Sequence, residues 1–95
     1  MIIIAGYEIV DEADRDAYVA AFRDLVNRAR AADGCVDVAI SADSLDLRRI
    51  NTIEIWRDRD ALNAWRRRAD APNPRIKVRG IAMKLYNATD GGSLF

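Results

Sequence analysis

The chain has 95 residues, of which 51% are hydrophobic, and this size predicts a single domain that spans residues 1–95. Fifteen basic and fifteen acidic residues leave no net charge, which argues against nucleic acid and anionic membrane surfaces as partners. There is no histidine and only one cysteine, so histidine-dependent dyads, imidazole metal sites and thiolate zinc sites are excluded. No apolar run approaches the roughly 18 residues of a membrane span, and no secretory signal precedes the domain. We therefore expect a cytoplasmic protein.

The first half of the chain predicts a strand, a helix and a second strand. Residues 1–10 carry branched and aromatic side chains on both alternating faces, as a strand covered on both sides does. Asp11 is expected to cap a helix that extends to about Ala32, because apolar residues follow at spacings of three and four. Gly34 ends this helix, since glycine adopts the left-handed conformation at little cost. Alternation of period two then predicts a strand over Cys35–Ser41.

The second half predicts a strand, a shorter helix and a final strand. Arg49–Trp56 alternates in the manner of a strand. Asp58 is expected to cap a helix over Arg59–Ala69, whose inner face is apolar. Two prolines make the next segment irregular, and a strand pattern returns over Val78–Ala88.

The predicted element order, β-α-β-β-α-β, is that of the α+β, ferredoxin-like split βαβ fold. Such a fold is a four-stranded antiparallel sheet with two helices on one face. The helices cover only one face, yet the first strand carries apolar residues on both: Ile2, Ile4 and Val10 on one side, and Ile3, Ala5, Tyr7 and Ile9 on the other. The second face therefore also needs cover. We therefore expect a homodimer in which two sheets pack together, although a different partner protein would satisfy the pattern equally well.

The segment Asn51–Trp56, with sequence NTIEIW, carries the most specific signal in the chain. Together with the following Arg57–Ala64 it resembles the N-x-x-E-x-W and A-L-x-A signature of the antibiotic biosynthesis monooxygenase family. Three upstream segments are similar to the family's first strand, its first helix and the exit from that helix: Ala5–Tyr7, Asp11–Tyr18 and Ala31–Cys35. The resemblance thus covers nearly the whole chain. It implies a dimeric α+β barrel. Several members oxidise phenolic, quinol or anthrone-like substrates with O₂ and without a metal or flavin.

The chain departs from the family pattern at three positions. Many members have a histidine nine residues after the signature tryptophan, where this chain has Trp65. The haem-degrading branch has an asparagine on the first strand and an iron-ligating histidine ten residues after the helical tryptophan. Those positions are Tyr7 and Arg75 here, so the proximal iron ligand is missing and the resemblance does not extend to haem degradation.

A cofactor-free oxygenase needs a dry pocket for a flat substrate and donors that stabilise the developing negative charge. The candidate catalytic residues are Tyr7, Trp65 and Asn51, and the candidate substrate-binding residues are Trp56, Arg75 and Tyr86. We expect them around a cavity between the sheet and its helices. Both tryptophans have core packing as an alternative role, and strand alternation turns Asn51 and Trp56 to opposite faces.

Two further side chains have structural interpretations. Glu54 lies in an apolar strand, where pairing with an arginine of the same or of a second subunit is favoured over a general-base role. Cys35 is expected to be a small buried strand residue without a catalytic function.

The sequence therefore supports two hypotheses from different classes. The first is a cofactor-independent monooxygenase that acts on a flat phenol, anthrone or quinol with O₂. The second is a non-catalytic dimer that binds a small aromatic ligand or assists a pathway.

Overall fold

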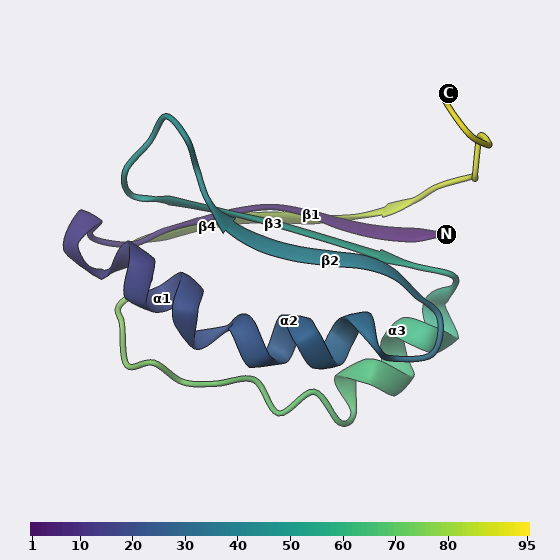
Figure 1. Cartoon of the computed structure of the whole chain (residues 1–95), viewed down its shortest axis with the longest axis horizontal. Coiled ribbons are helices and arrows are strands. Elements are labelled where there is room, and N and C mark those ends of the chain that lie inside the picture. The colour runs from purple at the N-terminus through teal and green to yellow at the C-terminus, as the bar shows by residue number, and fades with distance from the viewer.

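The computed structural model describes residues 1–95, and in it four strands form one antiparallel sheet (Figure 1). The order across the sheet is β2-β3-β1-β4, in which β1 is Ile2–Ile9, β2 is Cys35–Ala42, β3 is Arg49–Trp56 and β4 is Gly80–Asn87. All helices lie on one side of the sheet: the short 3₁₀ helix η1 (Glu12–Asp14), α1 (Arg15–Ala21), α2 (Arg23–Arg30) and α3 (Arg59–Arg66). The predicted ferredoxin-like α+β fold is confirmed.

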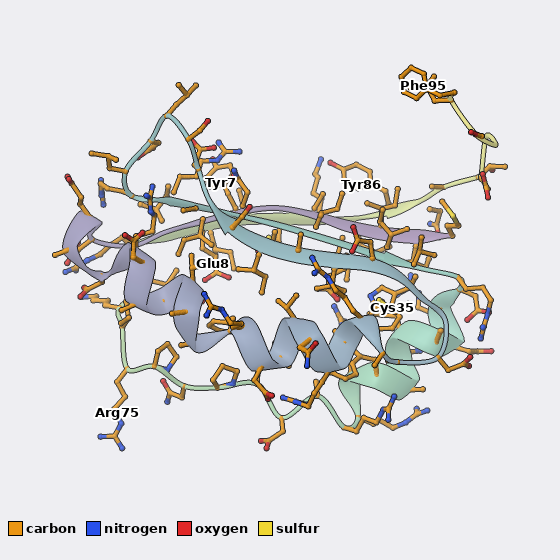
Figure 2. All side chains as sticks on the ribbon, in the orientation of Figure 1. Tyr7, Glu8, Cys35, Arg75, Tyr86 and Phe95 are labelled. Atoms are coloured by element: carbon orange, nitrogen blue, oxygen red, sulfur yellow. The ribbon has the colours of Figure 1, made fainter.

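Strand β1 is central, and its register fixes the faces of the whole sheet. Ile2 lies opposite Trp56 of β3 and opposite Asn87 of β4. Successive side chains alternate between faces, so the even-numbered residues of β1, which include buried Ile2 and Ile4, point toward the helices. Figure 2 shows Glu8 on this helix-covered face, whereas Tyr7 and Tyr86 lie on the opposite, open face.

The predicted first helix is interrupted at Phe22, which separates α1 from α2. The N–H of Phe22 bonds three residues back to the carbonyl of Val19, as in a tight 3₁₀ turn, and its ring stacks on Tyr18 with centroids 4.9 Å apart. The prediction that Asp11 caps the helix is wrong. Its side chain makes no cap hydrogen bond and instead pairs with Arg79, 3.0 Å away, which lowers the pKa of Asp11.

The remaining element boundaries follow the sequence pattern closely. β3 matches its prediction at both ends, and β2 extends one residue further, to Ala42. The Asp58 cap is confirmed, because the carboxylate accepts a 2.8 Å hydrogen bond from the N–H of Ala61. α3 ends at Arg66 rather than Ala69, and none of the helices combines the length and hydrophobicity of a membrane span.

The turn at Gly34 joins the end of α2 to β2. Gly34 has φ of +78°, in the left-handed region that was expected there. A Cβ at this position would also collide with the Cβ of Ala61 in α3. The glycine therefore allows α3 to lie close to the α2–β2 connection.

The core between the sheet and the helices consists of two separate groups of buried residues. The larger group surrounds Trp56, Leu62 and Trp65 at the α3 end of the sheet. The smaller group is Val10, Tyr18 and Ile50 at the α1 end. No charged or polar residue is fully buried, and the side chains between the two groups are only partly covered.

Candidate functional site

The strip of sheet between the two core groups centres on Gly6. Thr52 of β3 and Met83 of β4 flank it directly, and all three residues are half-buried on the helix-covered face. A Cβ on Gly6 would collide with the backbone carbonyl of Ala82, so glycine is required for the close approach of β1 and β4.

At one end of this strip, Glu8 and Tyr18 form a hydrogen-bonded pair. The Tyr18 hydroxyl donates to Glu8 Oε2 at 2.6 Å, from α1 across to β1. Burial, followed by the hydrogen bond to Glu8, raises the pKa of Tyr18, so this phenol stays protonated. Glu8 Oε1 accepts no hydrogen bond within the chain, which leaves it free to accept a proton from a ligand.

At the other end, Glu54 is bound by Trp56. The indole Nε1 of Trp56 donates to Glu54 Oε1 at 3.1 Å, and no arginine of the same chain pairs with Glu54. Pairing with an arginine of a second subunit stays a prediction. Trp56 is fully buried and stacks on Trp65, with ring centroids 6.1 Å apart and planes 23° apart. Trp56 thus supports the site from within the core, and its N–H is already occupied.

Trp65 differs from Trp56 because its indole N–H has no partner in the chain. Only 7% of Trp65 is exposed. Its indole nitrogen is nevertheless not fully buried, because Arg15 Nε is the sole fully buried polar side-chain atom without a hydrogen bond. The Trp65 nitrogen therefore reaches accessible space. The guanidinium groups of Arg28 and Arg68 lie 5.8 and 5.7 Å from the centroid of its ring, so the surroundings are cationic.

These groups define what we call the interlayer site: Gly6, Glu8, Tyr18, Glu54 and Trp65. Glu54 lies beside Ile4 in the adjacent strand, so Glu8 and Glu54 are four residues apart along the sheet. At about 3.4 Å per residue, the two carboxylates flank a strip roughly 14 Å long. The site offers free carboxylate oxygens, which can accept a proton. It also offers a free indole N–H, which can stabilise an oxyanion.

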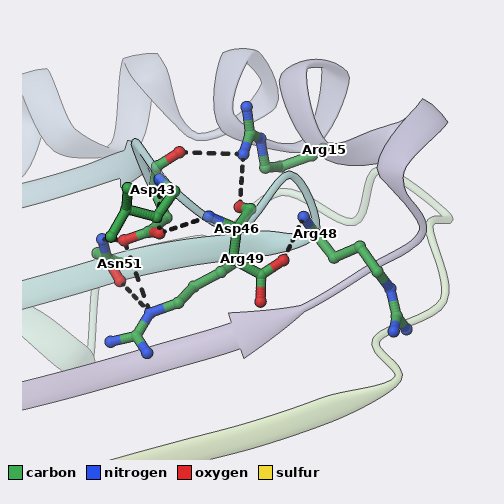
Figure 3. Close-up of polar contacts among 7 residues, drawn as sticks. Arg15, Asp43, Asp46, Arg48, Arg49 and Asn51 are labelled. Atoms are coloured by element: carbon green, nitrogen blue, oxygen red, sulfur yellow. Dashed lines mark hydrogen bonds and ion pairs between the residues drawn. The ribbon is translucent and has the colours of Figure 1, made fainter.

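The open face holds a different polar group, drawn in part in Figure 3. The Arg49 guanidinium lies 4.0 Å from the centroid of the Tyr7 ring, and Arg49 Nε donates to Asn51 Oδ1 at 2.7 Å. Asn51 in turn donates to Asp43 at 2.8 Å. That hydrogen bond, with two backbone N–H groups of the β2–β3 loop, lowers the pKa of Asp43 to about 2. Arg15 binds the carbonyls of Asp43 and Asp46 from the helix side.

The six predicted site residues do not converge in one place. Trp56 and Trp65 lie together on the helix-covered face, while Tyr7, Asn51 and Tyr86 lie on the open face. Arg75 belongs to neither group, since it is exposed in the irregular segment after α3 and points outward (Figure 2). The expectation of one shared cavity is wrong for a single chain, because strand alternation places residue 7 opposite the helices.

Glu8 and Tyr18 are the residues that sequence analysis missed. They are ten residues apart, and no motif in the sequence pairs them. A lone glutamate in an otherwise apolar strand was the one available signal, but its partner depends on how α1 lies across β1.

The single cysteine and the acidic residues offer no metal or nucleophile site. Burial, followed by the charges of Asp37 and Glu54, raises the pKa of Cys35, which disfavours the thiolate. No three carboxylate or thiol side chains gather closely enough to hold a metal ion.

Solved structures share this architecture over their whole length. A Deinococcus radiodurans protein whose name places it with the antibiotic biosynthesis monooxygenases matches with a TM-score of 0.82, 16% identity, and coverage of 100% of this chain and 99% of that one. A Nitrosomonas europaea protein named in the same way matches with a TM-score of 0.76, 18% identity and full coverage of both chains. A Mycobacterium tuberculosis protein matches with a TM-score of 0.71, 21% identity, and coverage of 97% of this chain and 98% of that one. No curated protein matches the sequence significantly.

These likenesses, together with the sheet and its one-sided helical layer, define a ferredoxin-like α+β protein. The family model of the antibiotic biosynthesis monooxygenases matches residues 1–71. The chain belongs to this family.

Proposed function

We propose that the protein is a cofactor-independent oxygenase that binds a flat phenol, quinol or anthrone in the interlayer site. The observation that carries the proposal is the pair of partly accessible carboxylates, Glu8 and Glu54, on the same face as the free N–H of Trp65. Both carboxylates are held by neutral donors and neither is paired with a cation. Such carboxylates remain available as bases.

The proposed chemistry requires little from the protein. Glu54, which lies at the Trp65 end of the site, takes the acidic proton of the substrate, and the Trp65 N–H stabilises the resulting negative charge. The electron-rich anion then reduces O₂. For an anthrone, the CH₂ between two rings becomes C=O, one oxygen atom enters the product and the other leaves as water. The substrate supplies all four electrons, so the balance needs no external reductant.

Oxygen consumption by metal-stripped, flavin-free protein tests the proposal. A panel of anthrones, naphthols and quinols should give uptake above the spontaneous rate. Glu54→Gln and Trp65→Phe should each reduce kcat by about 100-fold, the order expected for losing a base or an oxyanion donor. Glu12→Gln, at an exposed carboxylate of η1, is the matched control. Full turnover by Trp65→Phe would remove the proposed role of its N–H.

The open face enters the proposal as the surface that a second copy covers. It carries a shallow groove of about 430 Å³ lined by Ala5, Tyr7, Ala82 and Tyr86, and it exposes 38% of Ile53. Packing two such faces buries this apolar area in a homodimer. Tyr7, Asn51 and Tyr86 then act at the seam between the copies. If Tyr7→Phe left kcat and KM unchanged, Tyr7, Asn51 and Tyr86 would serve dimer assembly and not the reaction.

A non-catalytic binding protein is the second candidate. The complete burial of Trp56 and the 7% exposure of Trp65 favour it, because core packing alone explains both side chains. Thermal stabilisation by an aromatic ligand of the panel, without O₂ uptake from any member, would support binding without catalysis.

A further inference from the structure

A second hollow lies outside the interlayer site, along the outer edge of the sheet. It is a groove of about 840 Å³ between β2 and the pair α1 and α2, which lie together beneath that strand in Figure 1. Its apolar lining residues are Val19, Ala20, Ala21, Val26, Ala39 and Ile40. No residue of the interlayer site lines it.

The rim of this groove carries three side chains of α2 that have hydrogen-bond donors. Arg23, Asn27 and Arg30 line it at spacings of four and three residues, so they share one face of α2. Arg23 makes no ion pair and no side-chain hydrogen bond within the chain. The one acidic residue of the lining, Asp24, is already paired with Arg28 at 2.8 Å. The groove therefore offers a free guanidinium beside an apolar lining.

Side chains occupy the edge of β2 at Val38. The N–H of Val38 donates to Asp37 Oδ1 at 2.9 Å, and its carbonyl accepts from Arg30 Nε at 2.8 Å. Side chains that occupy the edge groups of a strand oppose the addition of a further strand. This favours a small molecule over an extended peptide as the occupant of the groove.

We propose that the groove binds an anionic amphiphile, a molecule with an apolar body and one carboxylate or sulfonate. The body lies on Val19, Val26 and Ile40, and the acid group pairs with Arg23. The volume falls within the range of roughly 300–1,000 Å³ that small-molecule pockets occupy. This site is additional to the proposed oxygenase site and does not depend on it.

A matched pair of fluorescent probes tests the charge requirement. 8-Anilino-1-naphthalenesulfonate is anionic, whereas N-phenyl-1-naphthylamine has a similar apolar body without the acid. Arg23→Gln should weaken binding of the sulfonate about fivefold, the order expected for one partly exposed ion pair, and leave the neutral probe unchanged. Arg59→Gln, at an exposed and unpaired arginine of α3, is the control. Equal affinities for the sulfonate in both variants would overturn the proposal.

A second variant tests the location. Ala20 is exposed on α1 and lines the groove, so Ala20→Phe should fill it without disturbing the core and weaken both probes. Unchanged binding of both probes would place them elsewhere. Light scattering on Arg23→Gln adds a further arm: a change in oligomeric state would show that a second copy, rather than a small anion, occupies the groove. Turnover in the interlayer site is measured separately, so the two proposals fail independently.

Discussion

At the scale of single residues, side chains of the same type differ in their hydrogen-bond partners. Trp56 and Trp65 stack on each other, but the N–H of Trp56 donates a hydrogen bond to Glu54, whereas the N–H of Trp65 has no partner in the chain. Similarly, the hydroxyl of Tyr18 is bound to Glu8, whereas Tyr7 lies beneath the guanidinium of Arg49. Candidate roles therefore follow from the partners that each side chain already has.

Replacing Tyr18 by phenylalanine should lower the free energy of unfolding by about 1.5–3 kcal/mol, because a hydrogen bond to a charged carboxylate is lost. Chemical denaturation at pH 7 measures this change. Tyr86→Phe, at an exposed phenol without a hydrogen bond, is the control. A Tyr18→Phe protein as stable as the wild type would show that Glu8 gains nothing from the pair.

The alkaline pH dependence of stability should identify the same phenol. The folded pKa of Tyr18 is raised above the unfolded value near 10, so its contribution is complete below pH 10 and is lost as the pH rises further. The wild type should therefore lose stability above pH 10 more steeply than Tyr18→Phe, by up to about 1.4 kcal/mol per pH unit. Parallel stability curves for the two proteins would contradict the raised pKa.

At the scale of elements, the β2–β3 loop is organised by one carboxylate. Asp43 accepts hydrogen bonds from the N–H groups of Leu45 and Asp46 and from the amide of Asn51 (Figure 3). Arg15 fixes the loop carbonyls from α1. The loop is thus held on both sides, although its tip carries Leu45 at 92% exposure.

Asp43→Ala should release this loop, since three hydrogen bonds share that side chain. Hydrogen exchange of the Leu45 and Asp46 amides should accelerate, and Ser44→Ala, at an exposed neighbouring residue, should leave it unchanged. In the wild type the folded pKa of Asp43 is depressed to about 2. The protection is therefore present above pH 4 and is lost as the pH falls through 2. If the Leu45 and Asp46 amides still exchanged slowly in Asp43→Ala, the hydrogen bonds from Arg15 would be what holds the loop.

Gly34→Ala should destabilise the protein by more than the roughly 1–2 kcal/mol that a left-handed alanine costs. The additional loss comes from the collision of the new methyl group with the Cβ of Ala61. Combining Gly34→Ala with Ala61→Gly should remove the loss that comes from the collision. A double-mutant cycle on the free energies of unfolding measures this loss. Additive effects would mean that α3 moves aside freely.

The sequence predicted the elements better than it predicted the site. β3 is matched at both ends because neither glycine nor proline interrupts its alternation, and Asp58 marks the helix after it. Asp11 was misassigned because Arg79, which binds its carboxylate, lies 68 residues away in the chain. The Glu8–Tyr18 pair eluded prediction for the same reason: it depends on how a helix crosses a strand, which periodicity does not encode.

At the scale of the whole molecule, one layer of helices covers one face of the sheet and leaves the other bare. Ile53, in the middle of the open face, is 38% exposed, so a lysine fits there in a single copy. In the proposed homodimer the same lysine would be buried without a partner charge, which is strongly unfavourable.

Ile53→Lys should therefore yield a folded monomer. Size exclusion with light scattering measures the mass, and circular dichroism checks the fold. Ala31→Lys, at an exposed position just after α2, should remain a dimer. A dimeric Ile53→Lys protein would move the interface away from the open face.

The sheet order also constrains how the chain is made. Both neighbours of β1, the strands β3 and β4, are encoded after it, and the nearer one ends 47 residues beyond Ile9, at Trp56. During ribosomal synthesis this apolar strand thus emerges before either of its partners and stays unpaired until β3 has been made. Only the last strand, β4, turns β1 from an edge into an interior strand. Nascent chains stalled before Gly80 would carry an uncovered edge prone to association.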